Sequence, residues 1–222
     1  MISAVIPTLN AEATLERTLA GLAQSSLIGE IIVADAAGTD ATKAIAERHS
    51  AAVIACERGR GRQLAAGAAR ARHDWLLFLH ADTVLGEGWA EAADRFMADN
   101  DDERAAVFRF ALDDTSSCAR VLEWFVKLRV RVFALPYGDQ GLLISRAFYD
   151  SLGGFKPLPL MEDVDLIRRI GRKRLRSLAA PAITSAARYK SGGYMFRPLR
   201  NLFCLTLYFL GVAPEKIERF YR

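Results

Sequence analysis

Along the first hundred residues, short apolar runs alternate with segments whose apolar residues recur at helical spacing. Four apolar runs have the length of strands: 3–8, 30–35, 51–56 and 75–80. A helical segment follows each run, and the first presents Leu15, Leu19 and Leu22 on one face. We expect Asn10 to cap that helix. Because the runs are apolar throughout, they predict an α/β fold with a mostly parallel sheet covered by helices on both faces.

The second half of the chain continues with strands and helices in a less regular order. We expect a strand at 105–112, a strand, helix and glycine stop over 141–155, and a helix at 161–170. Segment 178–184 is expected to form a short edge element that Pro181 breaks. Segment 119–133 has the pattern of an amphipathic helix, and its expected inward residues are Val121, Leu122, Phe125, Leu128 and Val132.

After Asn201, the segment 201–213 is apolar on every side of a helix, with Thr206 the one polar interruption before Pro214. A helix of about a dozen residues reaches roughly 18 Å, which is too short to span the ~30 Å hydrocarbon core of a bilayer. Three interpretations stay open, namely core packing, a homodimer contact, and a peripheral membrane contact through 197–213. Arg197, Arg200, Tyr208 and Phe209 suit the headgroup boundary of a membrane.

The chain has 222 residues, a length typical of one domain with a sizeable core. We expect a basic, apolar tail at 186–222. The first ten residues lack the features of a signal peptide, and the three cysteines follow no metal or disulfide spacing. These features predict a cytoplasmic protein, with the inner face of the membrane as the alternative location.

Positive charge gathers in the last quarter of the sequence. From residue 168 to 222 the chain carries 13 Lys or Arg and two acids, Glu215 and Glu218, although its formal net charge is only +4. A basic segment favours anionic partners such as phosphates or anionic lipid, and a solvated basic face is the alternative. We expect no nucleic-acid binding, because the sequence contains no nucleic-acid-binding module.

Polar residues follow each predicted strand, and ligands of open α/β sheets bind at the carboxyl ends of the strands. The strands end at Pro7-Thr8, Asp35, 58–62 and His80-Ala81-Asp82. Neither the dinucleotide fingerprint Gly-x-Gly-x-x-Gly nor the phosphate loop Gly-x-x-x-x-Gly-Lys follows the first strand. Carboxylates at two buried strand ends, with arginines between them, suit a ribose, a metal ion or phosphates.

Five segments, quoted in order, resemble the glycosyltransferases of family 2, which have the GT-A fold. They are "AVIPTLNAEATLERTL", "IIVADAAGTDAT", "GRGRQLAAGAARA", "LLFLHADT" and "GDQGLLISRAFYDSLGGF…LMEDVDLIRRI". The resemblance covers roughly residues 2 to 170, and it implies a nucleotide-binding half (1–112) and an acceptor and catalytic half (113–185). It implies an inverting, metal-dependent transfer of one sugar from a UDP- or GDP-sugar to a hydroxyl of a sugar or lipid-linked acceptor.

The resemblance also implies roles for single residues. Asp82 corresponds to the last position of an Asp-x-Asp motif that binds Mg²⁺ or Mn²⁺, and Asp163 corresponds to the general base, with Glu162 beside it. The implied nucleotide-binding residues are Pro7, Thr8, Glu12, Asp35, Arg62, His80 and Ala81. Asp139 and Gln140 are expected on the acceptor side, and Arg188 and Lys190 near the diphosphate.

Elementary chemistry favours the same two roles, one carboxylate for the metal ion and another for the acceptor proton. A cation held by oxygen ligands stabilises the charge on a leaving diphosphate. A second carboxylate is needed to take the proton from the acceptor hydroxyl. Glu162 and Asp163 also suit the N-terminus of a helix, where acids interact favourably with the helix dipole.

The sequence departs from the family pattern at three places. His80 stands where the family usually has an aspartate, so we expect it to hydrogen-bond near the nucleotide rather than to ligate the metal. Asp35 lacks a second acid nearby. The Gln-x-x-Arg-Trp motif of processive synthases is missing, which predicts transfer of a single sugar.

Two other functions compete with this interpretation. A sugar-phosphate nucleotidyltransferase would need a glycine-rich, basic loop after the first strand, and "PTLNAEATLE" has no glycine. A non-catalytic nucleotide-sensing or membrane-associated module would use the basic tail, and it would bind nucleotide without turnover.

Overall fold

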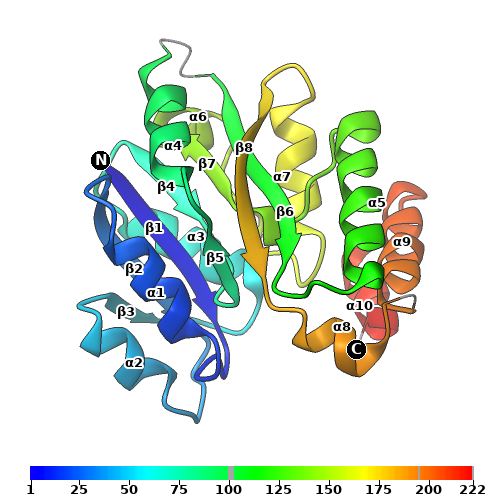
Figure 1. Ribbon diagram of the computed structural model, residues 1–222, viewed down its shortest axis with the longest axis horizontal. Helices are drawn as coiled ribbons and strands as arrows, with labels where there is room; N and C mark the ends of the chain where they lie inside the picture. The colour runs from blue at the N-terminus through cyan, green and yellow to red at the C-terminus, as the bar shows by residue number, and fades with distance from the viewer. Residues whose placement is uncertain (100–102, 195, 222) are drawn as a thin grey trace.

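One eight-stranded sheet forms the centre of the molecule, with helices on both of its faces (Figure 1). The computed structural model describes residues 1–99, 103–194 and 196–221. The strands lie in the order β3-β2-β1-β4-β7-β6-β8-β5. Their bounds are β1 Ile2–Thr8, β2 Ile28–Asp35, β3 Ala52–Ala55, β4 Trp75–Phe78, β5 Thr83–Leu85, β6 Ala105–Leu112, β7 Leu142–Ser145 and β8 Leu175–Thr184.

The helices follow the strands closely in the first half of the chain and gather at its end. Their bounds are α1 Leu15–Ala23, α2 Thr42–Arg48, α3 Arg60–Arg70, α4 Trp89–Ala98, α5 Ser117–Phe133, α6 Arg146–Ser151, α7 Glu162–Ile170, α8 Ala187–Gly192, α9 Phe196–Phe209 and α10 Pro214–Tyr221. A short 3-10 helix, Gly138–Gln140, precedes β7. Within the described residues, no helix combines the length and the apolar character needed to cross a membrane.

The sheet is parallel in one half and mixed in the other. β3, β2, β1 and β4 pair in parallel, whereas β7 is antiparallel to both β4 and β6. β8 runs parallel to β6, and β5 closes the far edge antiparallel to β8. The predicted α/β class is therefore confirmed, and the parallel sheet predicted from the apolar runs holds for the first four strands.

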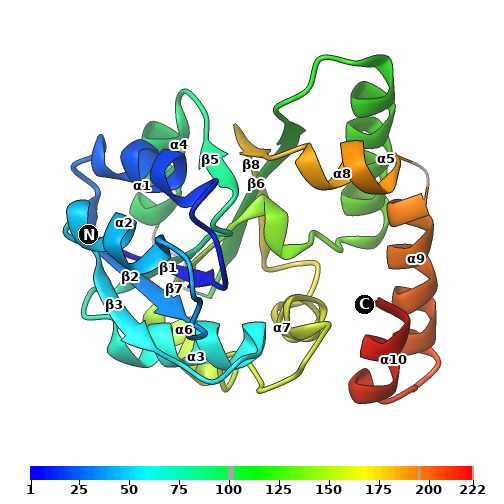
Figure 2. The ribbon, with the colours of Figure 1, turned by 90° about the horizontal axis from the view of Figure 1, so that it is seen from below.

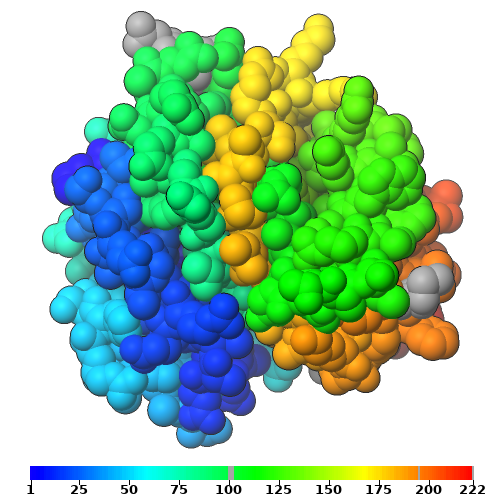
Figure 3. All heavy atoms as spheres, in the orientation of Figure 1, coloured from blue at the N-terminus to red at the C-terminus, as the bar shows by residue number. Residues whose placement is uncertain are grey.

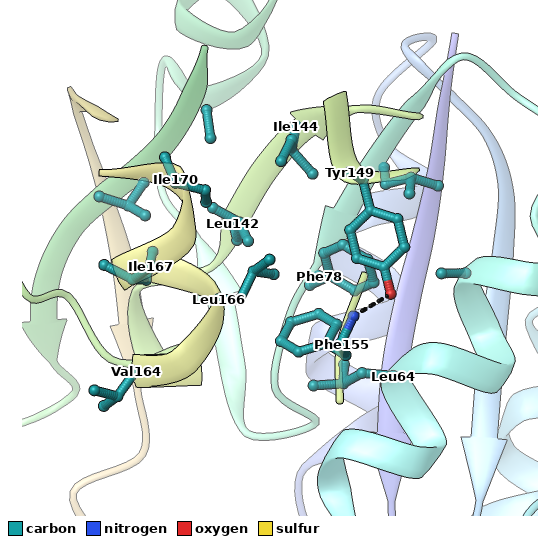
Figure 4. Close-up of a cluster of buried hydrophobic side chains, with 14 of the residues drawn as sticks. Leu64, Phe78, Leu142, Ile144, Tyr149, Phe155, Val164, Leu166, Ile167 and Ile170 are labelled. Carbon is teal, nitrogen blue, oxygen red and sulfur yellow. Dashed lines mark hydrogen bonds between the residues drawn. The ribbon is translucent and has the colours of Figure 1, made fainter. Parts of the chain in front are cut away.

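Two apolar clusters cover the two faces of the sheet. Along β1, Ala4 and Ile6 point into the cluster beneath α1, α2 and α4, while Val5 points into the cluster beneath α3, α6 and α7. Figure 4 shows the second cluster, where side chains of α7 lie near Leu142 of β7 and Phe155 lies beside Leu64 of α3. There the backbone N–H of Phe155 donates a hydrogen bond to the Tyr149 hydroxyl over 2.9 Å. This packing holds the start of α7 beside the start of α3.

Several sequence-based expectations about single elements are wrong. Asn10 does not cap α1, which begins after Thr14; Asn10 adopts a left-handed conformation and its Oδ1 accepts a hydrogen bond from the backbone N–H of Thr39. The segment around Pro181 is no edge element but the last part of β8, which lies between β6 and β5. A register irregularity between β6 and β8 accommodates this proline, which has no N–H to donate.

Helix α5 differs from its predicted orientation. Of the five residues expected to point inward, Leu122 is buried, whereas Val121, Phe125, Leu128 and Val132 are exposed. Ala119 and Val126 complete the buried face. The apolar residues of α5 therefore occupy two opposite faces. Most of the residues predicted to point inward lie on the outer face.

The carboxyl ends of several strands meet at one edge of the sheet. β1, β2, β3 and β4 run in the same direction, so the residues that follow Thr8, Asp35 and Phe78 emerge together. The antiparallel β7 starts at this edge, which adds Gly138–Gln140, and β6 and β8 end there. Figure 2 looks onto this edge and shows the C-terminal end of α10 turned toward α7.

Candidate active site

A cavity of about 760 Å³ opens at the carboxyl edge of the sheet. It lies beyond β1 and β4, between the turn after β1, the start of α3 and the loop before α7. The predicted residues that line it are Pro7, Thr8, Arg62, His80, Ala81, Asp82 and Arg188. A smaller cavity of about 110 Å³ adjoins it, shares His80, Asp82 and Arg188, and is also lined by Asp139, Glu162 and Asp163. The structure thus brings together most of the residues singled out from the sequence.

Four of the predicted site residues lie outside these two cavities. Glu12 accepts a hydrogen bond from the backbone N–H of Ala41, and Asp35 accepts bonds from the Thr8 hydroxyl (2.8 Å) and from the backbone N–H of Gly38. Both carboxylates therefore hold loops at the strand ends. Gln140 lines a different groove, and Lys190 forms an ion pair with Asp114 over 3.3 Å.

The turn at residues 80–83 presents His80 and Asp82 to both cavities. β4 ends at Phe78, two residues earlier than the apolar run predicts, and the backbone N–H of Thr83 closes the turn on the His80 carbonyl. Asp82 forms no ion pair within the described part of the chain, and only the Thr83 hydroxyl approaches its carboxylate, at 3.5 Å. An unpaired carboxylate at this place is free to bind a ligand.

His80 is directed toward Arg60 rather than toward Asp82. The guanidinium of Arg60 lies 3.4 Å from His80 Nε2, and Gly138 packs so closely on the ring that a Cβ there would lie 2.6 Å from the same nitrogen. Burial lowers the pKa of His80, and the positive charge of Arg60 lowers it further. A neutral His80 can accept a hydrogen bond from Arg60.

Arg60 connects the two sides of the site through a partly buried ion pair. Its Nε lies 3.1 Å from Oε1 of Glu162, whose side chain is 2% exposed. Burial raises the pKa of Glu162, and Arg60 opposes that rise. Glu162, expected beside the base, thus positions Arg60, and this arginine is the member of the 58–62 cluster that reaches both cavities.

Asp163 lies at the start of α7 with its carboxylate held in place. Its Oδ2 accepts a hydrogen bond from the backbone N–H of Gly138 over 2.8 Å. Asp139 lies next to this glycine, and its Oδ1 is buried without a hydrogen-bond partner among the described residues. Burial raises the pKa of Asp139 to about 6, and the nearby carboxylates of Asp163 and Asp82 contribute to the rise. A group of acids therefore lines the smaller cavity.

The sequence analysis missed the residues that the C-terminal tail contributes. Arg197 and Asn201 of α9 line the smaller cavity, and Tyr221 of α10 lines both cavities. Tyr189 of α8 and Tyr137 complete this side of the smaller cavity. The available signal was the basic, aromatic composition of the tail, which does not reveal which face of each helix points inward.

The donor set suits a cation that takes further ligands from a diphosphate. Among residues 1–99, 103–194 and 196–221, no three His, Cys, Asp or Glu side chains are grouped to hold a metal ion. Mg²⁺ in nucleotide-binding sites uses one or two carboxylates together with phosphate oxygens and water. The unpaired Asp82 and the orphaned Oδ1 of Asp139 fit this mode.

The fold and the site define an α/β protein with a cavity at the carboxyl edge of its sheet, the usual place for a ligand in such folds, lined by both arginines and carboxylates. The model of the family "Glycosyl transferase family 2" matches residues 3–116, just over half of the 222 residues. The chain belongs to this family. No curated protein matches the chain in sequence.

Solved structures of low sequence identity share the fold. TarS 1–349 of S. aureus superposes with a TM-score of 0.66 at 16% identity, over 92% of this chain and 64% of that one. The same TarS fragment has been solved in complex with UDP-GlcNAc (TM-score 0.64, 16% identity, covering 92% and 65%). The present chain thus spans less than two thirds of the TarS fragment.

A second protein with this fold is glucosyl-3-phosphoglycerate synthase of Mycobacterium tuberculosis. Its complex with Mn²⁺, UDP-glucose and phosphoglyceric acid has a TM-score of 0.60 at 21% identity, over 81% of this chain and 69% of that one. At these identities the likeness shows the GT-A fold.

Proposed function

We propose that the protein is an inverting, metal-dependent glycosyltransferase that moves one sugar from a nucleotide-diphosphate sugar to a hydroxyl acceptor. The observation that carries the proposal is that Asp82 and Asp163, 81 residues apart in sequence, line one cavity with Arg60 between the larger and the smaller chamber. The family membership and the nucleotide-sugar complexes of TarS and the phosphoglycerate synthase support it.

The larger cavity is the proposed donor site. Pro7, Thr8 and Ala81 form an uncharged wall suited to the nucleoside, and Arg62 and Arg188 supply positive charge for the diphosphate. When bound, Mg²⁺ or Mn²⁺ supplies Lewis-acid stabilisation of the diphosphate. Asp82 would hold that cation, with Asp139 as a further carboxylate in the same cavity.

The smaller cavity is the proposed acceptor site. Asp163 would take the proton from the acceptor hydroxyl, and the N–H of Gly138 fixes the orientation of its carboxylate. A base on the acceptor side, opposite the diphosphate, fits an in-line attack that inverts the anomeric centre. The absent Gln-x-x-Arg-Trp motif favours transfer of a single sugar.

A thermal-shift screen tests the donor assignment most directly. UDP-glucose, UDP-GlcNAc and GDP-mannose would each be added with and without Mn²⁺, and the expected result is a Mn²⁺-dependent rise of the melting temperature with one nucleotide class. The Asp163→Asn variant should show the same shift and lose transfer. Binding without turnover by the unaltered protein, across acceptor extracts, would instead indicate a nucleotide sensor.

We infer a cytoplasmic protein, and the tail segment 197–213 has two candidate partners, a membrane surface and a second copy of the chain.

A further inference from the structure

The outer side of α5 is apolar where a surface helix is normally polar. Val121, Trp124, Phe125, Leu128 and Val132 are each more than 40% exposed, and Trp124 and Phe125 reach 58% and 57%. Their spacing places them on one continuous stripe, opposite the buried face of the helix. Figure 3 shows α5 on the surface of the molecule, at the right of the view.

Helix α9 adds a second exposed apolar face at the same end of the molecule (Figures 1 and 2). Only Cys204 and Leu205 of its described residues are buried. Its exposed large apolar residues are Phe196, Leu199, Leu202, Phe203 and Phe209. Large exposed apolar patches on a protein surface mark interaction sites. We call the exposed apolar residues of α5 and α9 together the apolar face.

A basic groove runs along the flank of α5, next to the apolar face. Its volume is about 560 Å³, it lies between α5 and the β6–β8 strands, and Trp124 belongs to both groove and face. Six cations line it: Arg109, Arg120, Lys127, Arg131, Arg172 and Arg176. The one acid among the lining residues, Glu123, already forms an ion pair with Arg120 at 2.8 Å. The groove therefore holds a net positive charge that the described residues do not neutralise.

We propose that the apolar face seats on an anionic lipid bilayer and that the basic groove takes a phospholipid headgroup. Aromatic and aliphatic side chains bordered by Lys and Arg are the signature of a surface that lies in the membrane interface. A second copy fits less well, because a twofold contact through the apolar face would bring two basic grooves toward each other. The proposal widens the contact of segment 197–213 to α5, and it is independent of the proposed glycosyl transfer.

Vesicle co-sedimentation tests the proposal with two compositions, phosphatidylcholine alone and phosphatidylcholine with about 30% phosphatidylglycerol. The unaltered protein should pellet with the anionic vesicles and stay in solution with the neutral ones. The Lys127→Glu/Arg131→Glu variant should bind the anionic vesicles at least about tenfold more weakly, since each basic residue near an anionic surface contributes appreciably. Phe125→Ser/Leu128→Ser should also reduce binding, at unchanged charge.

The matched control is Lys43→Glu/Arg70→Glu, which changes the net charge equally at exposed positions of α2 and α3. It should bind within about twofold of the unaltered protein. Equal loss in both charge variants, equal binding to neutral vesicles, or no binding to either would overturn the proposal. So would a dimer in light scattering without lipid that Phe125→Ser/Leu128→Ser dissociates, because a second copy would then occupy the face.

Discussion

Nε of Arg60 lies 3.1 Å from Oε1 of Glu162, and this ion pair joins the start of α3 to the start of α7. Replacing Glu162 by Gln leaves the charge of Arg60, whose side chain is 33% exposed, without its partner. Because an unpaired, partly buried charge is costly, we expect the free energy of unfolding to fall by about 2–3 kcal/mol. Urea unfolding followed by circular dichroism measures the change.

The Glu57→Gln variant is the matched control, since Glu57 pairs with Arg62 at an exposed position of the same region. Exposed ion pairs contribute about 0–1 kcal/mol, so this variant should stay close to the unaltered protein. Equal losses in the two variants would show that the Arg60–Glu162 pair does not stabilise the site.

Replacing Asp163 by Asn should lower kcat by roughly 10²–10⁴-fold with the nucleotide affinity unchanged. The side-chain oxygen of Asn can still accept the hydrogen bond from Gly138, so the loop geometry is retained while the base is lost. Steady-state kinetics and calorimetric titration with UDP measure the two effects. Asp165→Asn removes an acid of the same helix turn that pairs with Lys156 and Arg169, and it should lower stability with little change in kcat.

Mn²⁺ should tighten the binding of UDP by about tenfold or more in calorimetry, and Asp82→Asn should remove that gain. The reason is that Asp82 is the unpaired carboxylate at the junction of both cavities. Addition of EDTA should return the unaltered protein to the metal-free affinity. Asp94→Asn, at an exposed position, serves as the control. If Mn²⁺ still tightens UDP binding in Asp82→Asn, a residue other than Asp82 binds the metal.

Stability should depend on pH through Asp139. Its pKa is raised to about 6 by burial, so the folded protein binds this proton more tightly than the unfolded chain does. Its protonation therefore stabilises the fold at acid pH, and that stability is lost as the pH rises from about 4 through about 6. The titration of His80 is common to the protein and its Asp139→Asn variant, so it cancels in their difference.

Urea unfolding at pH 4.5 and 7.5, with EDTA and without nucleotide, checks this expectation. Between pH 4.5 and 7.5, the free energy of unfolding of the unaltered protein should fall by on the order of 1–3 kcal/mol more than that of Asp139→Asn. A difference that does not vary with pH would mean that Asp139 has an ordinary pKa.

The sequence predicted the first half of the fold well because local and tertiary signals agree there. The strands ending at Thr8 and Asp35 are buried on both faces, so a plain apolar run identifies them. The short strand Thr83–Leu85 was not predicted, because three residues are too few to show a periodicity. On α5 the outer stripe carries the larger side chains, and the pattern alone does not tell a core-facing stripe from an interaction surface.

Site residues that directly follow strands could be predicted from the sequence. Those whose orientation depends on tertiary packing could not. The turn at Asp82 and the helix start at Asp163 emerge at the same edge, as the topology requires. Lys190 and Arg188 are two residues apart, yet only Arg188 lines the cavities, because the helical turn directs Lys190 to Asp114. The contribution of Tyr221 depends on how α10 folds back, which no local pattern encodes.

Gly61 permits a close backbone contact beside the proposed donor site. A Cβ at this position would lie 2.3 Å from the carbonyl oxygen of Lys156 and 3.1 Å from that of Leu158. Since backbone carbonyls cannot move aside cheaply, Gly61→Ala should cost about 1–3 kcal/mol of stability. It should also weaken UDP binding, because both α3 and the 157–160 loop line the larger cavity.

The control is Gly21→Ala in α1, whose new Cβ meets only the Val84 side chain at 3.1 Å. That variant should keep UDP affinity and stay within about 1 kcal/mol, since alanine favours a helix. Equal UDP affinity in both variants would show that the donor site does not depend on this contact.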